Sequence, residues 1–303
     1  MAIPATRVST VLGAAAGFDL TDLPTAKTEL SLKTTDTSKD AWLTLAIAQV
    51  SRTIARYCSR TFQPQYLQDL FQFGRDPAFA GVRFGGSDQI TLSARPALAV
   101  TSVVQALPDG NTRTLVQGTD YLADLAAARL IRLRADGLEQ RWEAYPLTVQ
   151  YVAGFGVMVA ETGSVPGGAP YQVTVTQSEA FSCGVSVAYA SGALLTQVTA
   201  APQQGQYALD AVNGLYTFAA ADAGQVLAFS YATADIPDDV VEVCLGLITA
   251  RYYARGRDPN LMSQETPQVG VQRWWIGGSP GQAGEFAPDV EAALGRYRAP
   301  TVG

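Results

Sequence analysis

The sequence offers few residues that could carry acid–base or nucleophilic chemistry. It contains no histidine, which removes the commonest general base and the commonest metal ligand. A serine–lysine arrangement is poorly supported, because the only lysines are Lys27, Lys33 and Lys39, all close to the N-terminus. The glycine-rich stretches match neither a phosphate-binding loop nor a dinucleotide-binding fingerprint. We therefore expect a protein that is not an enzyme and that uses no cofactor and no metal.

Two carboxylate pairs stand in segments with regular patterning, Asp238 with Asp239 and Asp120 with Asp124. A pair of carboxylates is what a glycosidase needs, but no spacing in the sequence supports that chemistry. Acidic residues at a helix start interact favourably with the helix dipole, and those at a hairpin edge are ordinarily solvated. We interpret both pairs as structural.

The three cysteines, Cys58, Cys183 and Cys244, are odd in number and far apart. They show neither zinc-ligand spacing nor a disulfide framework. Cys58 and Cys244 fall in segments with helical patterning, and Cys183 falls in a segment with strand patterning. We expect three buried free thiols, which behave as small apolar side chains.

The side chains best suited to binding a protein partner lie near the C-terminus. Trp274 and Trp275 stand between glycine-rich flanks, and neighbouring strand residues face opposite sides, so both cannot enter one core. The alternative is that one tryptophan is buried and the other is an isolated surface aromatic. Trp, Tyr and Arg are enriched at interface hot spots. We predict a partner interface that contains Trp274, Trp275, Ile276, Phe286, Tyr297 and Arg298.

Composition and charge limit the remaining functions. The chain has 303 residues, of which 48% are hydrophobic and 16% charged, as in a folded globular protein. No apolar run approaches the roughly 20 residues that cross a bilayer, so we expect no membrane partner. The net charge is −6, and residues 160–236 carry five acidic and no basic side chains. Such a chain is poorly suited to tight nucleic-acid binding, which depends on neutralising phosphates.

Helical patterning marks both ends of the chain. Residues 37–57 repeat apolar side chains at helical spacing from Leu43 to Tyr57, and Thr37 and Asp40 have capping-box spacing. Residues 237–257 have acidic residues early and arginines late, as the helix dipole favours. In that helix we expect one buried stripe of Val241, Leu245, Ile248 and Tyr252, with Val240, Cys244 and Leu247 beside it. Shorter helices are predicted at residues 24–32 and 289–297.

Alternating patterns fill the middle of the chain. The first group predicts a small antiparallel sheet or barrel, with strands at residues 66–73, 89–92, 100–106, 120–124, 128–133 and 147–152. The second group predicts a compact all-β unit, with strands at residues 171–177, 183–189, 206–210, 215–218 and 226–231. Asn213–Gly214 in this second group is a strong hairpin signal.

These patterns predict an α+β protein in three parts. Residues 1–20 form an N-terminal arm. Residues 21–159 and 233–303 form a body, in which a small bundle of the N- and C-terminal helices accompanies the antiparallel β section. Residues 160–232 form an inserted, sandwich-like β domain, because residues 160–170 are rich in Gly and Pro and mark a boundary. We expect this insert to be peripheral, with few core contacts.

The order of these elements resembles the head–tail connector (adaptor) proteins of phages. The resemblance is carried by residues 23–30 (LPTAKTEL) with the helix after them, residues 90–96 (ITLSARP), residues 149–155 (VQYVAGF), and Ile236–Pro237 with residues 252–255 (YYAR). It covers residues 20–156 and 236–300. Residues 160–232 depart from the family's minimal form, which passes almost directly from the strand to the Ile-Pro helix.

The resemblance implies a structural virion protein of the neck. Such proteins form a ring, here expected to be dodecameric, that binds beneath the portal protein and extends the DNA channel. The implied partners are the portal protein, neighbouring copies of the same chain, a downstream neck or tail-terminator protein, and double-stranded DNA in transit. The implied location is the neck of the virion, assembled in the host cytoplasm.

A second function stays open. The β insert could serve as a host-surface or carbohydrate-binding module of a phage particle, and exposed aromatic side chains on the insert would favour that interpretation. An enzyme is the least supported alternative, because the usual base and the known motifs are missing.

Overall fold

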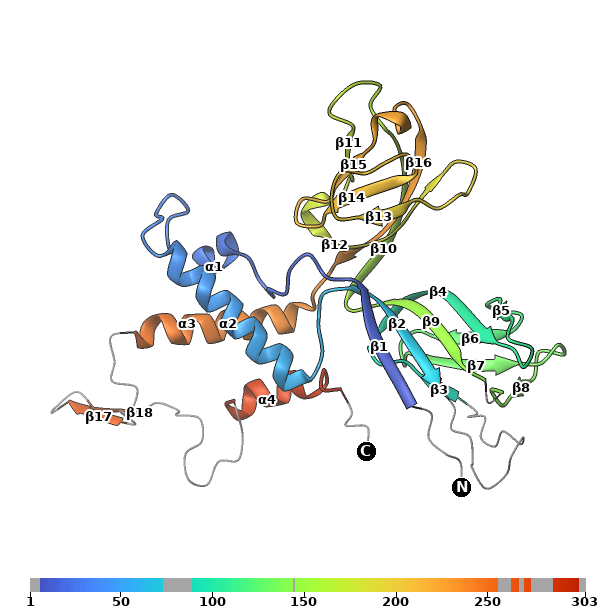
Figure 1. Cartoon of the computed structure of the whole chain (residues 1–303). Coiled ribbons are helices and arrows are strands. Elements are labelled where there is room, and N and C mark those ends of the chain that lie inside the picture. The colour runs from blue at the N-terminus through green and yellow to red at the C-terminus, as the bar shows by residue number, and fades with distance from the viewer. Residues whose placement is uncertain are drawn as a thin grey trace. The chain divides into compact units, whose positions relative to one another are not determined.

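The chain divides into two compact units. A β unit comprises Met1–Gly17 and Gln63–Asp235, and a helical unit comprises Phe18–Phe62 and Ile236–Gly303. The computed structural model describes residues 6–72, 89–143, 145–255, 263–266, 270–273 and 286–299. Helices and antiparallel sheets occur together (Figure 1), so the expected α+β class is confirmed.

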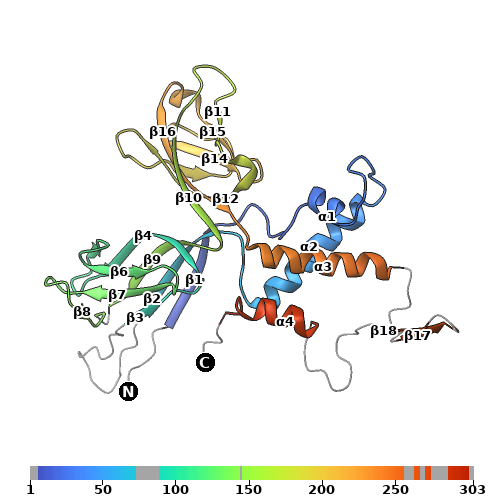
Figure 2. The same cartoon turned by 180° about the vertical axis from the view of Figure 1, so that it is seen from behind.

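The helical unit is built from segments at the two ends of the chain. Its helices are α1 (Leu23–Glu29), α2 (Asp40–Cys58), α3 (Asp238–Ala254) and α4 (Pro288–Gly295), and the strands β17 (Ser263–Thr266) and β18 (Gly270–Arg273) form a two-stranded pair. Helix α2 buries Leu43, Ile47, Val50 and Ile54, as its apolar repeat predicts. Helix α3 crosses α2 in both views (Figures 1 and 2).

The buried stripe of α3 differs from the prediction. Val240, Cys244 and Ile248 are fully buried, whereas Val241, Leu245 and Tyr252 are only half buried. Apolar residues surround most of this helix, so its periodicity does not single out one face. The buried face of α3 is therefore determined by its tertiary contacts and not by its apolar pattern.

The start of α2 also corrects an expectation. No side chain caps this helix, whose N-cap residue is Lys39. The Thr37 carbonyl accepts a hydrogen bond from the Asp40 amide, and the Asp40 carboxylate instead forms an ion pair of 2.6 Å with the buried Lys27 ammonium. The capping box that the spacing of Thr37 and Asp40 suggested is therefore not formed. The Asp40 carboxylate pairs with the buried Lys27 of α1 instead.

The β unit contains two sheets that share one core. The first has the order β1-β2-β9-β4-β5, and the second has the order β3-β7-β6 with β8 paired to β7. The strands of the first sheet are β1 (Thr6–Gly13), β2 (Gln65–Gln72), β9 (Leu147–Ala153), β4 (Ala97–Ala106) and β5 (Thr112–Thr114); those of the second are β3 (Gln89–Thr91), β7 (Arg129–Leu133), β6 (Tyr121–Asp124) and β8 (Glu139–Gln140). Leu67, Val103, Leu130, Trp142 and Val149 lie in the core between them. All six strands predicted for this section are present.

The N-terminal residues form a strand where an unpacked arm was expected. Strand β1 pairs antiparallel with β2 from Thr6↔Gln72 to Gly13↔Tyr66. Residues 7–12 are exposed on both faces of the strand. The sequence therefore lacks the alternation of apolar and polar residues that would predict β1. Its end packs tightly, because a Cβ on Gly13 would stand 3.0 Å from the carbonyl oxygen of Gly184.

Further strands of the β unit form a three-stranded and a four-stranded sheet. Their orders are β10-β16-β12 and β11-β15-β14-β13. The strands are β10 (Gly156–Ser164), β16 (Val226–Ala234), β12 (Phe181–Tyr189), β11 (Gln172–Thr174), β15 (Leu215–Phe218), β14 (Gln206–Asp210) and β13 (Thr196–Val198), with short 3₁₀ turns at Ser178–Ala180 and Ala220–Asp222. Their shared core is rich in aromatic residues, among them Phe181, Tyr216 and Phe229.

The expected boundary at residue 160 falls inside strand β10. This strand pairs with β16 without interruption from Gly156↔Ala234 to Ser164↔Val226. Gly163, which suggested a linker, lies where a Cβ would stand 3.3 Å from the Phe229 ring. A Cβ there would also stand 3.3 Å from Val173 of β11, so glycine permits the close approach of the second sheet.

Residues 160–232 have buried contacts with the rest of the β unit, while their expected peripheral position stays a prediction. Val152 of β9, Cys183 of β12 and Ala232 of β16 are fully buried and form one cluster. The Ser182 hydroxyl also donates a 2.8 Å hydrogen bond to the Pro64 carbonyl. Independent folding of residues 160–232 as an inserted domain stays a prediction.

Candidate interaction surface

The predicted partner-binding residues fall into two groups. Trp274, Trp275 and Ile276 lie outside the described residues. The structure places Phe286, Tyr297 and Arg298 in the helical unit, where all three lie beside the C-terminal end of α2.

Phe286 precedes α4, and Tyr297 and Arg298 follow it. The side chains of these three residues attach α4 to the rest of the helical unit. The buried Phe286 ring packs edge-on against Tyr57 at 5.1 Å between centroids, and the Arg298 guanidinium lies 5.1 Å from the same Tyr57 ring. The Tyr297 hydroxyl donates a 2.7 Å hydrogen bond to Asp239. Burial and the Asp239 carboxylate raise the pKa of Tyr297 to about 12. Phe286 and Tyr297 therefore have structural contacts within the helical unit, and their place in a partner interface stays a prediction.

A different set of aromatic and basic side chains, half buried or exposed, lies at the opposite end of α2. We define the Arg255 patch as Trp42, Tyr252, Tyr253 and Arg255. The Arg255 guanidinium stacks on two rings, 4.8 Å from the Trp42 centroid and 4.2 Å from the Tyr252 centroid. Its Nε donates a 3.3 Å hydrogen bond to the Tyr252 carbonyl, which fixes the side chain against the end of α3.

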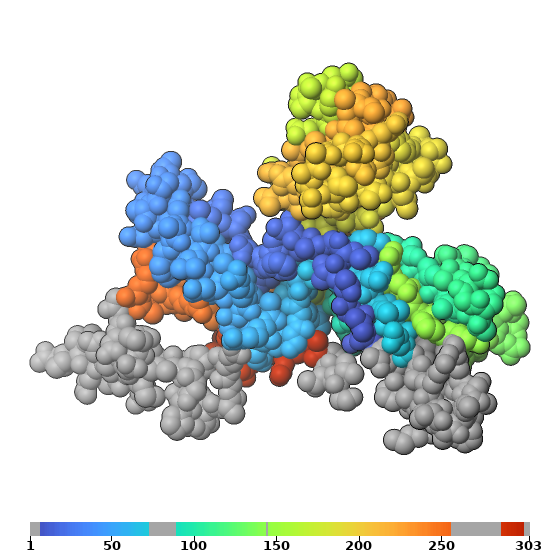
Figure 3. Space-filling view, viewed as in Figure 1, coloured from blue at the N-terminus to red at the C-terminus, as the bar shows by residue number. Residues whose placement is uncertain are grey.

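The outer part of the Arg255 patch faces solvent. Tyr253 is 72% exposed, and Arg255 is exposed as well. In the space-filling view, α1 and α2 in blue lie beside the orange α3 within the helical unit (Figure 3). Trp, Tyr and Arg held in fixed positions are the side chains that most often dominate protein interfaces.

Sequence reasoning missed the Arg255 patch although its parts were visible. Tyr252 was assigned to a buried stripe, and Arg255 was explained by the helix dipole. Their spacing of three residues does place them on one helix face, which was a usable signal. Trp42 belongs to a helix far away in the sequence, and only tertiary packing brings it beside them.

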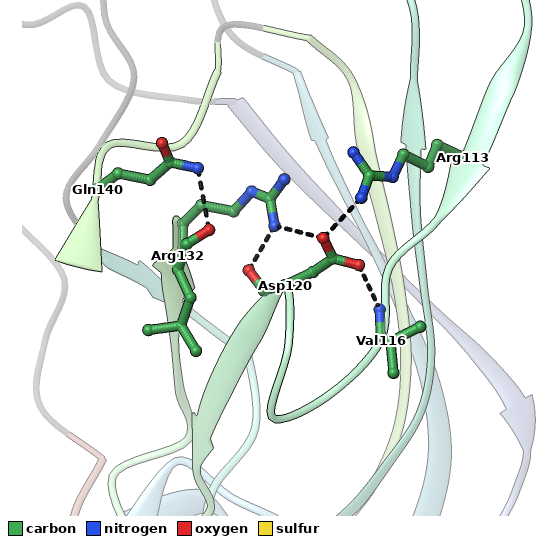
Figure 4. A network of polar contacts seen from close by, with 6 residues as sticks. Arg113, Val116, Asp120, Arg132 and Gln140 are labelled. Atoms are coloured by element: carbon green, nitrogen blue, oxygen red, sulfur yellow. Dashed lines mark hydrogen bonds and ion pairs between the residues drawn. The ribbon is translucent and has the colours of Figure 1, made fainter. Parts of the chain in front are cut away.

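Of the two carboxylate pairs considered for catalysis, Asp120 and Asp124 lie in the β unit, and Figure 4 shows the contacts of Asp120. Asp120 accepts hydrogen bonds from the Val116 amide at 2.9 Å and from Arg113 at 2.7 Å, and Arg132 forms an ion pair with it at 3.4 Å. The Val116 amide, followed by Arg132 and Arg113, holds the pKa of Asp120 below its usual value. A carboxyl group held ionised in this way is unsuited to donate a proton at neutral pH.

The second carboxylate of this pair is engaged in the same manner. Asp124 accepts from the Ala127 amide and pairs with Arg129 at 2.9 Å, and these contacts lower its pKa. The fully buried Asp69 accepts from the Ser93 amide at 2.7 Å and from the Tyr151 hydroxyl at 3.1 Å. Asp69 thereby fixes the turn that precedes Pro96, within a segment that carries the family resemblance.

The three cysteines are buried free thiols, as expected. Burial raises their pKa values to about 11 for Cys58, about 12 for Cys183 and about 11 for Cys244. Among the described residues, no cluster of His, Cys, Asp and Glu side chains could hold a metal ion. In the same part of the chain, no helix is both long and apolar enough to span a membrane.

Aromatic side chains of residues 160–232 point into the interior of their sheets. None of them is exposed: Phe181, Tyr207, Tyr216, Phe218, Phe229 and Tyr231 are buried, and Tyr171 and Tyr189 are half buried. Tyr189 donates a 2.6 Å hydrogen bond to the buried Asp222, so its polar end is used internally. The exposed aromatic surface that would favour carbohydrate binding is therefore not found on these residues.

Comparisons with known proteins give distant structural likenesses only. No protein-family model matches the sequence, and no curated protein matches it. The neck of an empty GTA particle computed with C6 symmetry aligns at 13% identity and a TM-score of 0.43, over 96% of this chain and 95% of that one. The virion of a native gene transfer agent (GTA) particle aligns at 12% identity and a TM-score of 0.42, over the same shares of the two chains. Similarities at these identities and TM-scores support no statement about the function of this chain.

Proposed function

We propose that this chain is a structural protein of the neck of a phage-like particle, a head–tail connector that forms a ring beneath the portal. The observation that carries the proposal is the composition of the helical unit. Helices α1 and α2 join α3 and α4 in one compact unit, although strands β2 to β16 separate them in the sequence. These are the segments whose sequences resemble the ends of phage connector proteins.

The state of the polar side chains supports a structural role over catalysis. Asp120 and Asp124 are each engaged by arginines and backbone amides, and the three thiols are buried. A connector needs rigid subunits and exposed docking surfaces, and the Arg255 patch is one such surface. We infer that the protein is not an enzyme and uses no cofactor.

The finer features of the proposal follow from the family resemblance. The ring is dodecameric, extends the channel of the portal protein and receives the next neck component or tail terminator on its other side. The N- and C-terminal helices form a small bundle, and residues 160–232 are an insert on this body. A net charge of −6 suits a channel through which double-stranded DNA must move without being held. Assembly takes place in the host cytoplasm and the product is the virion neck.

Carbohydrate or host-surface binding has less support. Such a site would use exposed aromatic rings, and those of residues 160–232 are buried or half buried. We therefore place the function in assembly.

Reconstitution with purified portal rings tests the proposal. The chain is mixed with the portal protein of the same particle, and the product is separated by size and imaged by electron microscopy. A ring of this protein stacked on one end of the portal is expected. Trp274→Ala with Trp275→Ala is expected to weaken the complex while the circular dichroism spectrum stays unchanged. Failure of the unaltered chain to associate with the portal at any ratio would contradict the proposal.

A further inference from the structure

The Arg255 patch carries positive charge that is fixed but not neutralised within the described residues. Arg255 is stacked on Trp42 and Tyr252, and Arg251 is exposed one turn earlier on α3. In the part of the chain that the structure describes, neither arginine forms an ion pair with a carboxylate. A partner that supplies carboxylates and a small apolar group would satisfy both the cations and the exposed Tyr253.

The β unit presents such a group at the turn between β14 and β15. We define the acidic tip as Glu179, Asp210 and Val212. Val212 is 74% exposed, which makes it a protruding apolar side chain, and Glu179 and Asp210 are exposed as well. A Cβ on Gly214 would stand 3.1 Å from the Cα of Ser178, so the turn lies against the residue that precedes Glu179.

The acidic tip is rigid and charged. Asp210 accepts a 3.1 Å hydrogen bond from the Val212 amide and a 2.6 Å hydrogen bond from the Asn213 side chain. These contacts, led by the Asn213 side chain, hold the pKa of Asp210 below its usual value. Since residues 160–236 contain no Lys or Arg, no basic side chain of this segment weakens the charge of the tip.

We propose that the acidic tip of one copy of this chain docks on the Arg255 patch of the next copy. Val212 would contact Tyr253, and Glu179 and Asp210 would pair with Arg251 and Arg255. The two surfaces differ, so the contact is head-to-tail, which is the type that generates closed rings. This inference rests on the proposed function, because it names the subunit contact of the ring.

Charge reversal on each side separately, followed by mixing, tests the contact. One variant is Arg255→Glu, the other is Glu179→Lys, and Arg52→Glu is a matched control on the same helical unit. Each is added to portal rings, and the number of bound copies is measured by native mass spectrometry. Each single variant is expected to assemble about tenfold or more weakly than the unaltered chain, since like charges face each other in every contact. The Arg52→Glu control is expected to assemble normally.

An equal mixture of the two variants is expected to restore assembly. Reversed patches then meet reversed tips, and unaltered patches meet unaltered tips, so the copies alternate around the ring at a one-to-one ratio. Normal assembly of either variant alone, or no rescue in the mixture, would overturn the inference. The unaltered chain in the same series reports on portal binding itself, so failure of the proposed function is seen separately.

Cross-linking in solution tests the same contact without the portal. Copies with Tyr253→Cys are mixed at high concentration with copies that carry Val212→Cys, and a short bismaleimide is added. The native thiols are buried and do not compete. A covalent dimer that forms only in the mixture is expected. Equal cross-linking in either variant alone, or none in the mixture, would count against the contact.

Discussion

Burial keeps the three thiols of this chain from acting as nucleophiles at neutral pH. The thiolate is the reactive form of cysteine, and burial raises the pKa values of Cys58, Cys183 and Cys244 to about 11, 12 and 11. We expect no reaction of the folded protein with a thiol reagent at pH 8. All three thiols should react once guanidinium unfolds the chain. Rapid reaction of one thiol in the folded state would show that its burial is incomplete.

Asp120 gives stability that depends on pH. Its pKa is lowered in the folded state, so its contribution is present above the usual carboxyl pKa near 3.8 and is lost as the pH falls through the folded value. We expect Asp120→Asn to lower the free energy of unfolding at pH 7 by about 2 kcal/mol, because the buried Arg132 loses its partner. Urea unfolding at pH 7 and pH 3 measures both effects.

The dependence of the free energy of unfolding on pH provides the control. The loss of stability between pH 7 and pH 3 should be smaller in Asp120→Asn than in the unaltered chain. Glu139→Gln removes one exposed carboxylate from the neighbouring strand and should leave the profile unchanged. An Asp120→Asn variant with unaltered stability at pH 7 would show that the network of Figure 4 contributes nothing net.

Among single residues, the sequence predicted chemistry better than it predicted contacts. The absence of histidine and the spacing of the cysteines were enough to predict buried free thiols. The roles of Phe286 and Tyr297 were not visible, because their partners Tyr57 and Asp239 come from distant helices. The Arg255 patch escaped notice for the same reason, since Trp42 joins it only through tertiary packing.

At the scale of elements, two glycines explain the turn at residues 153–156, which follows β9. Part of this turn belongs to the segment that resembles the connector family. Gly154 has φ +142, and a Cβ there would stand 2.6 Å from the Cα of Pro64. A Cβ on Gly156 would overlap the carbonyl oxygen of Thr233. Only glycine lets the chain turn from β9 into β10 at this place.

Alanine at these positions should therefore be costly. We expect Gly154→Ala and Gly156→Ala each to lower the free energy of unfolding by about 3 kcal/mol, through strain at the first and overlap at the second. Gly167→Ala is the matched control, because no atom lies within 4 Å of a Cβ built there. Thermal and urea unfolding compare the three variants. Equal stability of all three would refute the packing described for this turn.

Elements with a strong apolar period were predictable and the others were not. Helix α2 and the strands β2, β4 and β9 bury alternate or periodic side chains, so their sequences carry the signal. Strand β1 is exposed on both faces, and β10 contains glycine that packs against Phe229, so neither shows the expected alternation. Both are held by ladder hydrogen bonds to a neighbour that the sequence does not identify.

At the scale of the whole molecule, the proposed ring requires two different surfaces on each subunit. Residues 18–62 and 236–303 form the helical unit with the Arg255 patch, and the β unit carries the acidic tip. The two surfaces are chemically complementary and different from each other. A chain with two such surfaces is suited to closed head-to-tail association.

The copy number of this protein in an intact neck tests the central claim most directly. Necks are released from purified particles, and their composition is measured by native mass spectrometry together with electron microscopy. The account predicts a closed ring of this chain, dodecameric by the family resemblance, directly beneath the portal. One or two copies per neck, or a location away from the portal, would contradict it.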